Sequence, residues 1–421
     1  MKTIISLTVV LFSFYLHSVA QDCSGGRYAT ELFPTNTLTS NILYGNNIDL
    51  SGNSEDLYLD VYEPAGDTES SRPLIIMAHG GSFIGGDKAD GCTDKVCIAL
   101  TKLGYVTASV NYRMGMGFPI DEQSATQAVY RATHDARAAV RFFRKDFTEN
   151  GNTYGIDTSQ IYFGGQSAGA FMAIHLAYMN DVSEMPAVID TTLAGLGGGV
   201  EGNSGNPGYS SEVKAIISYS GAIVDTAFIG VDDTPMISFH GDADGTVPYA
   251  TAVISVLGFP LMEVDGSSSI ATRMDNLGIV NCFKPYPGED HVTECIKTSY
   301  FDTSAAYVRN WMLQFACGLP DNCGYEPDSS VVFGVEENST ATGFINAHPN
   351  PTENVSYLDL SGLNKGAWVV RMYDYMGRLV RTYSEPVEQV LSISKNNLAN
   401  GVYYIEITDG VTRSRSKVIF N

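Results

Sequence analysis

Apolar runs and helical patterns alternate over the larger part of the chain, between residues 28 and 318. Residues 72–81 (RPLIIMAHGG) and 105–113 (YVTASVNYR) are apolar runs bounded by turn residues, as strands buried on both faces of a sheet are. Between them, residues 94–104 (DKVCIALTKLG) have helical spacing and end in glycine, a helix stop signal. Residues 121–147 keep helical apolar spacing over a long stretch. This alternation predicts an α/β domain in which helices cover both faces of a mostly parallel sheet.

Further patterns extend this domain. Residues 56–64 (DLYLDVYEP) alternate apolar and polar side chains, which is typical of an antiparallel strand at a sheet edge. The remaining apolar runs predict three more strands and a closing helix, at residues 214–222, 234–242, 280–288 and 305–318. The Gly-, Ser- and Asn-rich stretch 180–212 interrupts the alternation and predicts a loop, which is either a plain mobile loop or a lid over a site.

The pattern changes after residue 323. Residues 324–345 predict a linker with some strand character. From residue 346 to 421, short strand patterns alternate with Gly and Asn turns, a spacing that favours a small all-β sandwich. We therefore expect one α/β domain over residues 21–323 and a second, smaller domain at the C-terminal end.

The first twenty residues have the features of a secretory signal peptide. Lys2 precedes an apolar stretch from Ile4 to Leu16, and the small residues Ser18 and Ala20 stand before the expected cleavage point. No later stretch contains eighteen consecutive apolar residues, so we expect no transmembrane segment in the mature chain.

The net charge of −22 excludes some classes of partner. Residues 346–421 hold 8 basic and 7 acidic side chains, so the acidic excess belongs to the larger N-terminal part. An acidic surface repels polyanions, and we therefore expect neither nucleic acid nor an anionic membrane as a partner.

A serine between small residues is either a candidate nucleophile or part of an ordinary turn. Residues 164–170 (GGQSAGA) follow the apolar run 160–163 and lead into the helical pattern 171–179. Such a segment is either an ordinary turn or the nucleophile elbow G-x-S-x-G, which exposes a reactive hydroxyl above a sheet. The choice depends on whether the chain supplies the partners that Ser167 would need, because a serine hydroxyl is a poor nucleophile without a base and an acid.

His291 is the candidate base. It lies in residues 286–292 (YPGEDHV), on a loop after the last predicted strand, where a base can reach the serine. His134 and His175 fall inside helical patterns and favour structural roles, and so does His240 at the end of a strand.

Residues 240–249 (HGDADGTVPY) offer two candidate acids, Asp242 and Asp244, and either can be a turn residue. We favour Asp244, which immediately precedes Gly245 in the turn that is expected to lead to the next helix. The order along the chain is then serine, aspartate, histidine.

The oxyanion formed by nucleophilic attack needs backbone N–H donors. Residues 79–83 (HGGSF) follow a predicted strand, and glycines there allow the backbone to approach a substrate closely. Gly81 and Ser82, with Ala168 directly after the nucleophile, are the candidate donors. The alternative reading of this segment is a tight turn at the end of a strand.

The chain has seven cysteines, all beyond the signal peptide, and an exported protein can oxidise them. Proximity in sequence suggests three pairs and leaves Cys23 over, although it does not fix the connectivity: Cys92–Cys97, Cys282–Cys295 and Cys317–Cys323. The second pair encloses His291, so we expect a disulfide there to brace the loop that carries the base. No His/Cys cluster has zinc spacing, and we expect no metal site.

Residues 28–318 resemble a bacterial carboxylesterase of the α/β-hydrolase superfamily. The resemblance is carried by HGGSFIGG, HDARAAVRFFR, GGQSAGA, HGDADGTVPY and GEDHV, and by the order of the three candidate residues. It implies an α/β-hydrolase fold with Ser167 as nucleophile, Asp244 as acid and His291 as base. Ser82 stands where many relatives have a third glycine, which implies a less roomy entrance.

Residues 346–421 resemble a type IX secretion (Por) C-terminal sorting domain, type A. The matching segments are PNPTENVSYLDL, YDYMGRLVR, LANGVYYIEI and SKVIF. The resemblance implies export across both membranes by the type IX machinery, followed by removal of the domain or attachment at the cell surface. The alternative is a carbohydrate-binding or other accessory β-domain.

These expectations combine into a secreted serine carboxylesterase that needs no cofactor and hydrolyses a small-molecule or polymer-linked ester through an acyl-enzyme. Two alternatives stay open at this point. One is a serine peptidase of the same superfamily, and the other is a non-catalytic adhesion protein with this fold.

Overall fold

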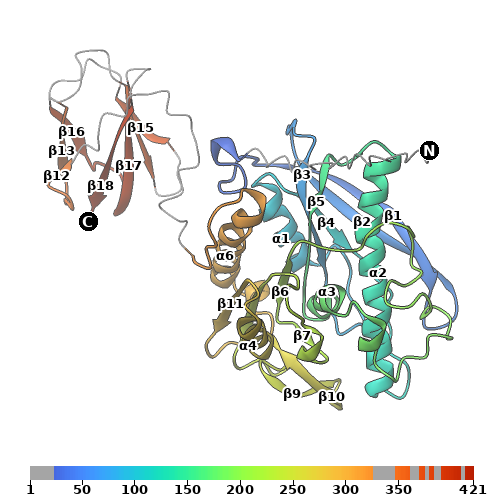
Figure 1. Ribbon diagram of the computed structural model, residues 1–421. Helices are drawn as coiled ribbons and strands as arrows, with labels where there is room; N and C mark the ends of the chain where they lie inside the picture. Colours follow the sequence, from blue (N-terminus) through green and yellow to red (C-terminus); the bar gives the residue numbers. More distant parts are fainter. Residues whose placement is uncertain (1–22, 326–346, 361–368, 375–378, 384–389, 409–412) are drawn as a thin grey trace, which may run out of the picture. The chain divides into compact units, whose positions relative to one another are not determined.

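The computed structural model of the chain describes residues 23–325 and 347–421, except 361–368, 375–378, 384–389 and 409–412. The chain divides into two compact units, Met1–Phe333 and Gly334–Asn421, which are described separately. The expected signal peptide and most of the expected linker lie outside the described residues (Figure 1).

An eight-stranded sheet forms the centre of the first unit. In spatial order, its strands are β1 (Asn36–Ile48), β2 (Ser54–Pro64), β4 (Val106–Val110), β3 (Arg72–Ala78), β5 (Ile156–Gln166), β6 (Ile216–Tyr219), β8 (Met236–Gly241) and β11 (Asn281–Tyr286). The strands from β4 to β11 are mutually parallel, whereas β1 and β2 are antiparallel. The mostly parallel sheet confirms the predicted fold class.

The outermost strand β1 was not predicted, so the expectation that residues 56–64 form the sheet edge is wrong. Residues 36–41 of β1 are mostly exposed on both faces, and their sequence therefore lacks the alternation that marks a half-buried strand. The strand β2 lies one position further in, between β1 and β4.

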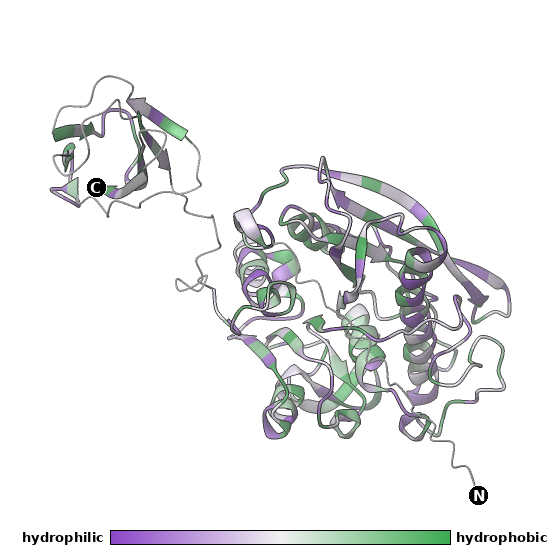
Figure 2. Ribbon diagram, turned by 45° about the horizontal axis from the view of Figure 1, so that its top comes forward, coloured by the Kyte–Doolittle hydropathy of each residue, from purple (hydrophilic) through white to green (hydrophobic). Residues whose placement is uncertain are grey.

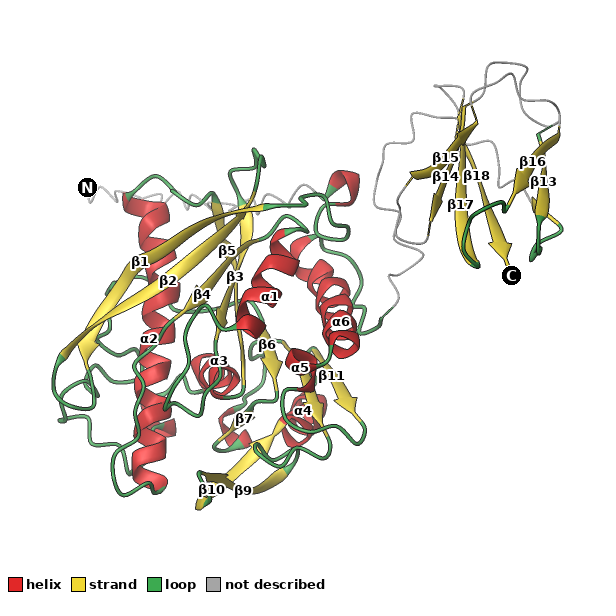
Figure 3. Ribbon diagram, turned by 180° about the vertical axis from the view of Figure 1, so that it is seen from behind, coloured by secondary structure: helices red, strands yellow, loops and turns green. Residues whose placement is uncertain are grey.

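Two layers of helices cover the sheet. They are α1 (Gly91–Thr101), α2 (Glu122–Glu149), α3 (Ala168–Tyr178), α4 (Ser267–Leu277), α5 (Thr293–Ile296) and α6 (Thr298–Ala316), and three short 3-10 turns, Ser24–Gly26, Val182–Glu184 and Thr226–Phe228, accompany them. Figure 3 shows α1 and α6 side by side on one face of the sheet. In Figure 2, hydrophilic and hydrophobic bands alternate along α2, as expected of an amphipathic helix.

The alternation of side chains along β3 divides the core between these layers. Leu74 and Ile76 join the apolar cluster that includes α2, α3 and α4, whereas Ile75 and Met77 join the cluster that includes α1 and α6. This is the period of two that a strand imposes, and it explains why β3 reads as a continuous apolar run.

A small antiparallel sheet precedes α4 where the sequence was expected to pass directly into a helix. It consists of β7 (Ala222–Ile223), β10 (Phe259–Gly266) and β9 (Thr251–Val256). The hairpin turns at Leu257 and Gly258, which both have positive φ. That expectation is therefore wrong, and the hairpin lies beside the candidate site.

The stretch 180–212 is held along α2. The carbonyl oxygen of Gly199 accepts hydrogen bonds from the Tyr130 hydroxyl, at 2.6 Å, and from Nε2 of His134, at 2.9 Å. The Glu201 carboxylate forms ion pairs with Arg137 and Arg141. These contacts favour a structural cover of α2 over a lid.

The described part of the second unit is a small β-sandwich, as predicted. One sheet contains β12 (Ala347–His348), β13 (Val355–Asp359) and β16 (Val390–Ser394), and the other contains β15 (Leu379–Tyr383), β14 (Val369–Asp374), β17 (Gly401–Thr408) and β18 (Arg413–Phe420). Both sheets contribute to one apolar core, in which Leu358 and Ile393 of the first meet Met372 and Ile405 of the second.

The cysteines pair across long distances in sequence, and the three expected pairs are wrong. The disulfides are Cys23–Cys317, Cys92–Cys295 and Cys282–Cys323, and Cys97 is a buried free thiol. Cys92 and Cys97 lie on the same helix, and five residues of α-helix rotate the side-chain direction by about 500°, which points the two in different directions. Cys97 faces the core, where it joins the cluster with Leu100 and Ile75.

Candidate active site

The candidate residues lie at the carboxyl end of the central sheet. Ser167 follows β5, Asp244 follows β8 and His291 follows β11, and the segment with Gly81 and Ser82 follows β3. These four strands are parallel, so the segments that follow them meet at one edge, which is the usual place of a site in an open α/β sheet.

Ser167 occupies a sharp turn between β5 and α3. Its backbone angles are φ 52° and ψ −118°, a sparsely populated combination for a residue other than glycine. The turn brings α3 so close to the sheet that a Cβ atom on Gly169 would lie 2.2 Å from the carbonyl oxygen of Ala78. Glycine is therefore required at position 169, and the pattern G-x-S-x-G follows from this geometry.

His291 lies between Ser167 and Asp244. Its Nε2 atom lies 2.8 Å from Oγ of Ser167, and its Nδ1 atom lies 2.7 Å from Oδ2 of Asp244. The Asp244 side chain is fully buried and the His291 side chain is 16 % exposed, while Ser167 as a whole is 9 % exposed. The structure thus brings the three predicted residues into one hydrogen-bonded chain.

The Asp244 carboxylate is held in its ionised form. Burial alone would raise its pKa, but hydrogen bonds from His240 and His291 and from the backbone hold the pKa of Asp244 well below its usual range. The other oxygen, Oδ1, accepts hydrogen bonds of 2.8 Å from the backbone N–H groups of Thr246 and Val247. An anion is therefore fixed beside the imidazole.

His240 contacts the same carboxylate, which the sequence did not indicate. Its Nε2 atom lies 3.1 Å from Oδ2 of Asp244, and its Nδ1 atom lies 2.8 Å from Oγ of Ser267. The residue is fully buried. A signal existed, because His240 and Asp244 are four positions apart in one turn, but nothing in the sequence shows that this turn folds back on itself.

Asp242 and Asp290 hold the two loops that carry the candidate acid and base. Oδ1 of Asp242 accepts a hydrogen bond of 2.6 Å from the N–H of Gly288. Oδ1 of Asp290 accepts one of 2.9 Å from the N–H of Gly245 and one of 2.8 Å from the N–H of His291. Asp290 was not singled out in the sequence, and it links the Asp244 turn directly to the His291 loop.

The candidate oxyanion donors differ in where they lie. Ser82 and Ala168 line a cavity together with Ser167, whereas Gly81 does not line it. A Cβ atom on Gly80 would lie 3.3 Å from Cβ of Ser167, so this turn passes directly beside the candidate nucleophile. Ala168 is the first residue of α3, and its N–H therefore has no acceptor within the helix.

The cavity beside Ser167 is small and mainly apolar, with a volume of about 50 Å³. Its walls come from the turn after β3, from α2 and α3, from the Asp244 turn and from the β9–β10 hairpin. The lining residues are Ser82, Phe83, Met116, Ala125, Val129, Ser167, Ala168, Phe171, Thr246, Val247, Ile254, Ser255, Val256, Leu261 and Met262. None of them comes from the stretch 180–212.

The other buried histidines contact neighbouring groups of the protein outside the candidate site. His134 contacts Gly199 as described above, Nδ1 of His175 lies 2.8 Å from the carbonyl oxygen of Phe171, and His79 stacks on Tyr112. Burial lowers the pKa of His134 and of His175 to about 4.

The described residues contain no group of three or more His, Cys, Asp or Glu side chains placed to hold a metal ion. Within the same residues, no helix has the length and apolar character that crossing a membrane requires.

Comparison with solved structures finds proteins similar to this chain. Three structures of esterase 2 from Thermogutta terrifontis resemble the chain over 68–70 % of its length and 97–100 % of theirs, with 19–20 % sequence identity and TM-scores of 0.47–0.48. They are the form phosphorylated by paraoxon, the propionate-bound form and the apo form. No curated protein matches the chain.

Two family models match the chain. Residues 59–225 match the BD-FAE model, and residues 346–421 match the model of the secretion system C-terminal sorting domain. The sorting domain marks a secreted or cell-surface protein. Residues 59–225 are thus similar to the BD-FAE family, and residues 346–421 are similar to the secretion system C-terminal sorting domain.

Proposed function

We propose that the chain is a secreted serine carboxylesterase that hydrolyses carboxylic esters through an acyl-enzyme. The observation that supports this most strongly is the chain of hydrogen bonds from Ser167 through His291 to Asp244, at 2.8 and 2.7 Å, beside an apolar cavity. Such a chain activates a serine hydroxyl, because the histidine accepts its proton and the carboxylate stabilises the resulting imidazolium.

In the first half of the reaction, Oγ of Ser167 attacks the ester carbonyl carbon, and its proton passes to Nε2 of His291. The tetrahedral intermediate collapses, the bond to the alcohol oxygen breaks, and His291 returns the proton to the leaving alcohol. In the second half, His291 takes a proton from water, and the hydroxide attacks the acyl-enzyme. The carboxylic acid leaves, and Ser167 regains its proton.

The oxyanion of both tetrahedral intermediates is bound by backbone N–H groups of Ser82 and Ala168, with Gly81 shaping the turn that presents Ser82. Ser82 and Ala168 support this role because both line the cavity with Ser167. Loss of one such donor typically costs about 3 kcal/mol of transition-state stabilisation. Because the donors belong to the backbone, serine serves at position 82 as well as glycine would.

The acyl group occupies the apolar cavity. Its volume of about 50 Å³ suits a short acyl group such as acetyl, and its walls of Phe83, Val129, Phe171 and Met262 offer no partner for a charge. A bulky aromatic acyl group such as feruloyl would have to displace these side chains.

Residues 21–323 form the catalytic domain in this proposal, after removal of residues 1–20 as signal peptide. Residues 346–421 act as the sorting signal that the type IX machinery recognises, and residues 324–345 link this domain to the catalytic domain. After export, the sorting domain is either removed or used for attachment at the cell surface.

Hydrolysis of a panel of substrates tests the proposed function. A set of p-nitrophenyl esters and a set of aminoacyl p-nitroanilides are compared under identical conditions. A serine carboxylesterase hydrolyses the first set and not the second. Preferred hydrolysis of the anilides would indicate a peptidase, and inactivity on both sets would indicate an adhesion protein.

A further inference from the structure

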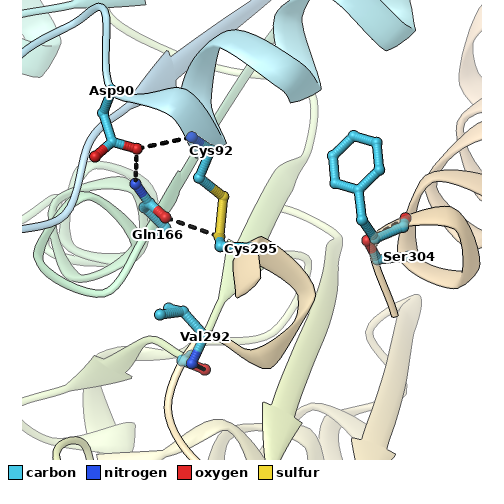
Figure 4. Close-up of a disulfide and its surroundings, with 8 residues drawn as sticks. Asp90, Cys92, Gln166, Val292, Cys295 and Ser304 are labelled. Atoms are coloured by element: carbon cyan, nitrogen blue, oxygen red, sulfur yellow. Dashed lines mark hydrogen bonds between the residues drawn. A yellow bond between two sulfur atoms is a disulfide. The ribbon is translucent and has the colours of Figure 1, made fainter. Parts of the chain in front are cut away.

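The Cys92–Cys295 disulfide joins two helices, α1 and α5, that neighbour each other near the candidate site. Cys92 is the second residue of α1, and Cys295 belongs to α5, four positions after His291. Figure 4 shows the two sulfur atoms bonded between these helices. Their Cα atoms lie 5.1 Å apart although 203 positions separate them in sequence.

Gln166 connects this disulfide to the nucleophile. It is the residue immediately before Ser167 and is 7 % exposed. Its Nε2 atom donates a hydrogen bond of 2.9 Å to Oδ1 of Asp90, and its Oε1 atom lies 2.8 Å from Sγ of Cys295 (Figure 4). This second contact carries no proton, because a disulfide sulfur has none to donate.

Asp90 completes the connection. The same oxygen, Oδ1, accepts a hydrogen bond of 2.8 Å from the N–H of Cys92 and so caps the first turn of α1. Gln166 is thus held between the start of α1 and the disulfide sulfur. The nucleophile turn, α1 and α5 form one connected unit through these four side chains.

The segment after His291 needs such an anchor. The helix α5 has only four residues, and a helix of this length does not form on its own. Val292 precedes it in a left-handed conformation, with φ 44°. Both carboxylate oxygens of Glu294 in α5 are buried and lack a hydrogen-bond partner among the described residues. The disulfide bonds α5 covalently to α1, and Gln166 connects both to the residue beside it, Ser167.

We propose that the Cys92–Cys295 disulfide and Gln166 are positioning residues that set the distance between Ser167 and His291. The proposal rests on the proposed function, since it concerns the base and the nucleophile of the esterase. Neither the disulfide nor the Gln166 side chain contacts reacting atoms. They act by limiting how far the His291 loop can move from the serine, because proton transfer requires hydrogen-bond distance.

The other disulfides provide a matched control. Cys23–Cys317 joins the first described residue to the residue that follows α6, and the hydrogen bonds that Ser167, Asp244 and His291 form among the described residues involve neither cysteine. It closes a loop of 294 positions, against 203 for Cys92–Cys295. Because the entropy of loop closure grows only with the logarithm of loop length, removal of either bond costs similar stability.

The test compares Cys92→Ala/Cys295→Ala with Cys23→Ala/Cys317→Ala in the full, oxidised chain, with p-nitrophenyl acetate as substrate. We expect kcat to fall at least about tenfold in the first variant with KM nearly unchanged, and to stay within about twofold in the second. Equal kcat values in the two variants would overturn the proposal.

A second pair of variants keeps all three disulfides. Gln166→Ala should lower kcat several-fold, whereas Gln160→Ala should not, although Gln160 is also buried and lies on the same strand. This pair decides the question if the first double variant fails to fold, and equal kcat values would again overturn the proposal.

The rate at which a fluorophosphonate labels Ser167 is measured in every variant, because it reports positioning without any ester substrate. A wild type that is labelled but does not hydrolyse esters would contradict the proposed function. The labelling rates of the variants would still test the positioning proposal in that case.

Discussion

Nε2 of His240 lies 3.1 Å from Oδ2 of Asp244, the same oxygen that Nδ1 of His291 approaches to 2.7 Å. One oxygen of the proposed acid is therefore in contact with two histidines. His240 also lies beside Ser267, and it is fully buried. It orients Asp244 and contacts no reacting atom.

Substitution of His240 tests this role. His240→Leu removes the donor, so Asp244 can rotate away from His291, and kcat should fall about tenfold. His240→Gln keeps an N–H donor at a similar place and should retain most of the activity. The measurement is kcat for p-nitrophenyl acetate, with the folded state of each variant checked by circular dichroism. Equal losses in both variants would show that His240 acts only through packing.

The two aspartates of the HGDADG segment should differ sharply. Asp244→Asn removes the charge that stabilises the imidazolium and should lower kcat by about 10⁴-fold. Asp242→Asn keeps an oxygen for the N–H of Gly288 and should cost less than about tenfold. Steady-state kinetics of both variants decide the assignment, and similar losses would remove Asp244 from the triad.

Acyl-chain length should control the rate. Because the cavity beside Ser167 holds about 50 Å³, kcat/KM should be highest for p-nitrophenyl acetate and fall steeply from butyrate to octanoate. Met262→Ala enlarges the cavity and should shift the preference toward longer chains. Leu257→Ala is the control, because Leu257 lies at the exposed tip of the same hairpin and does not line the cavity. An unchanged chain-length profile in Met262→Ala would place the acyl group elsewhere.

The free energy of unfolding should decrease as the pH rises, because Glu294 is buried. Burial raises the pKa of this carboxyl to about 8, with a smaller contribution from Asp244, against an ordinary value of 4.5. The folded state then binds a proton that the unfolded state releases, so the free energy of unfolding is highest below pH 4.5 and declines until about pH 8. Glu294→Gln should remove up to about 5 kcal/mol of this decline.

Urea unfolding at pH 5 and at pH 8.5 measures the effect. Wild type and Glu294→Gln should have similar free energies of unfolding at pH 5, and Glu294→Gln should be the more stable of the two at pH 8.5. Glu212→Gln serves as control, since Glu212 is exposed. A pH dependence that is the same in wild type and in Glu294→Gln would contradict the assignment.

Short motifs made the fold class and the candidate residues predictable from sequence. The elbow around Ser167 needs glycine at fixed positions for steric reasons, so it leaves a local signature. His291 and Asp244 were found because each follows a strand that is easy to recognise. The parallel order of these strands then brings the segments to one edge of the sheet.

The features that sequence reasoning missed depend on contacts between distant segments. Proximity in sequence suggested the pair Cys282–Cys295, but folding brings Cys92 to Cys295 across 203 positions. The role of His240 appears only once its turn has closed around Asp244. The β9–β10 hairpin did leave a signal, since mostly apolar residues stand on both sides of Gly258, and that signal points to a wall of the proposed acyl site only when the position of the hairpin is known.

Covalent labelling tests the proposal that Ser167 is the nucleophile. A fluorophosphonate reacts with an activated serine by forming an oxygen–phosphorus bond while fluoride leaves, and the adduct survives proteolysis. Peptide mass spectrometry should find one phosphonyl group on the peptide that contains Ser167, in step with the loss of esterase activity, and no label in Ser167→Ala. Labelling of a different residue, or esterase activity that persists in Ser167→Ala, would contradict the account.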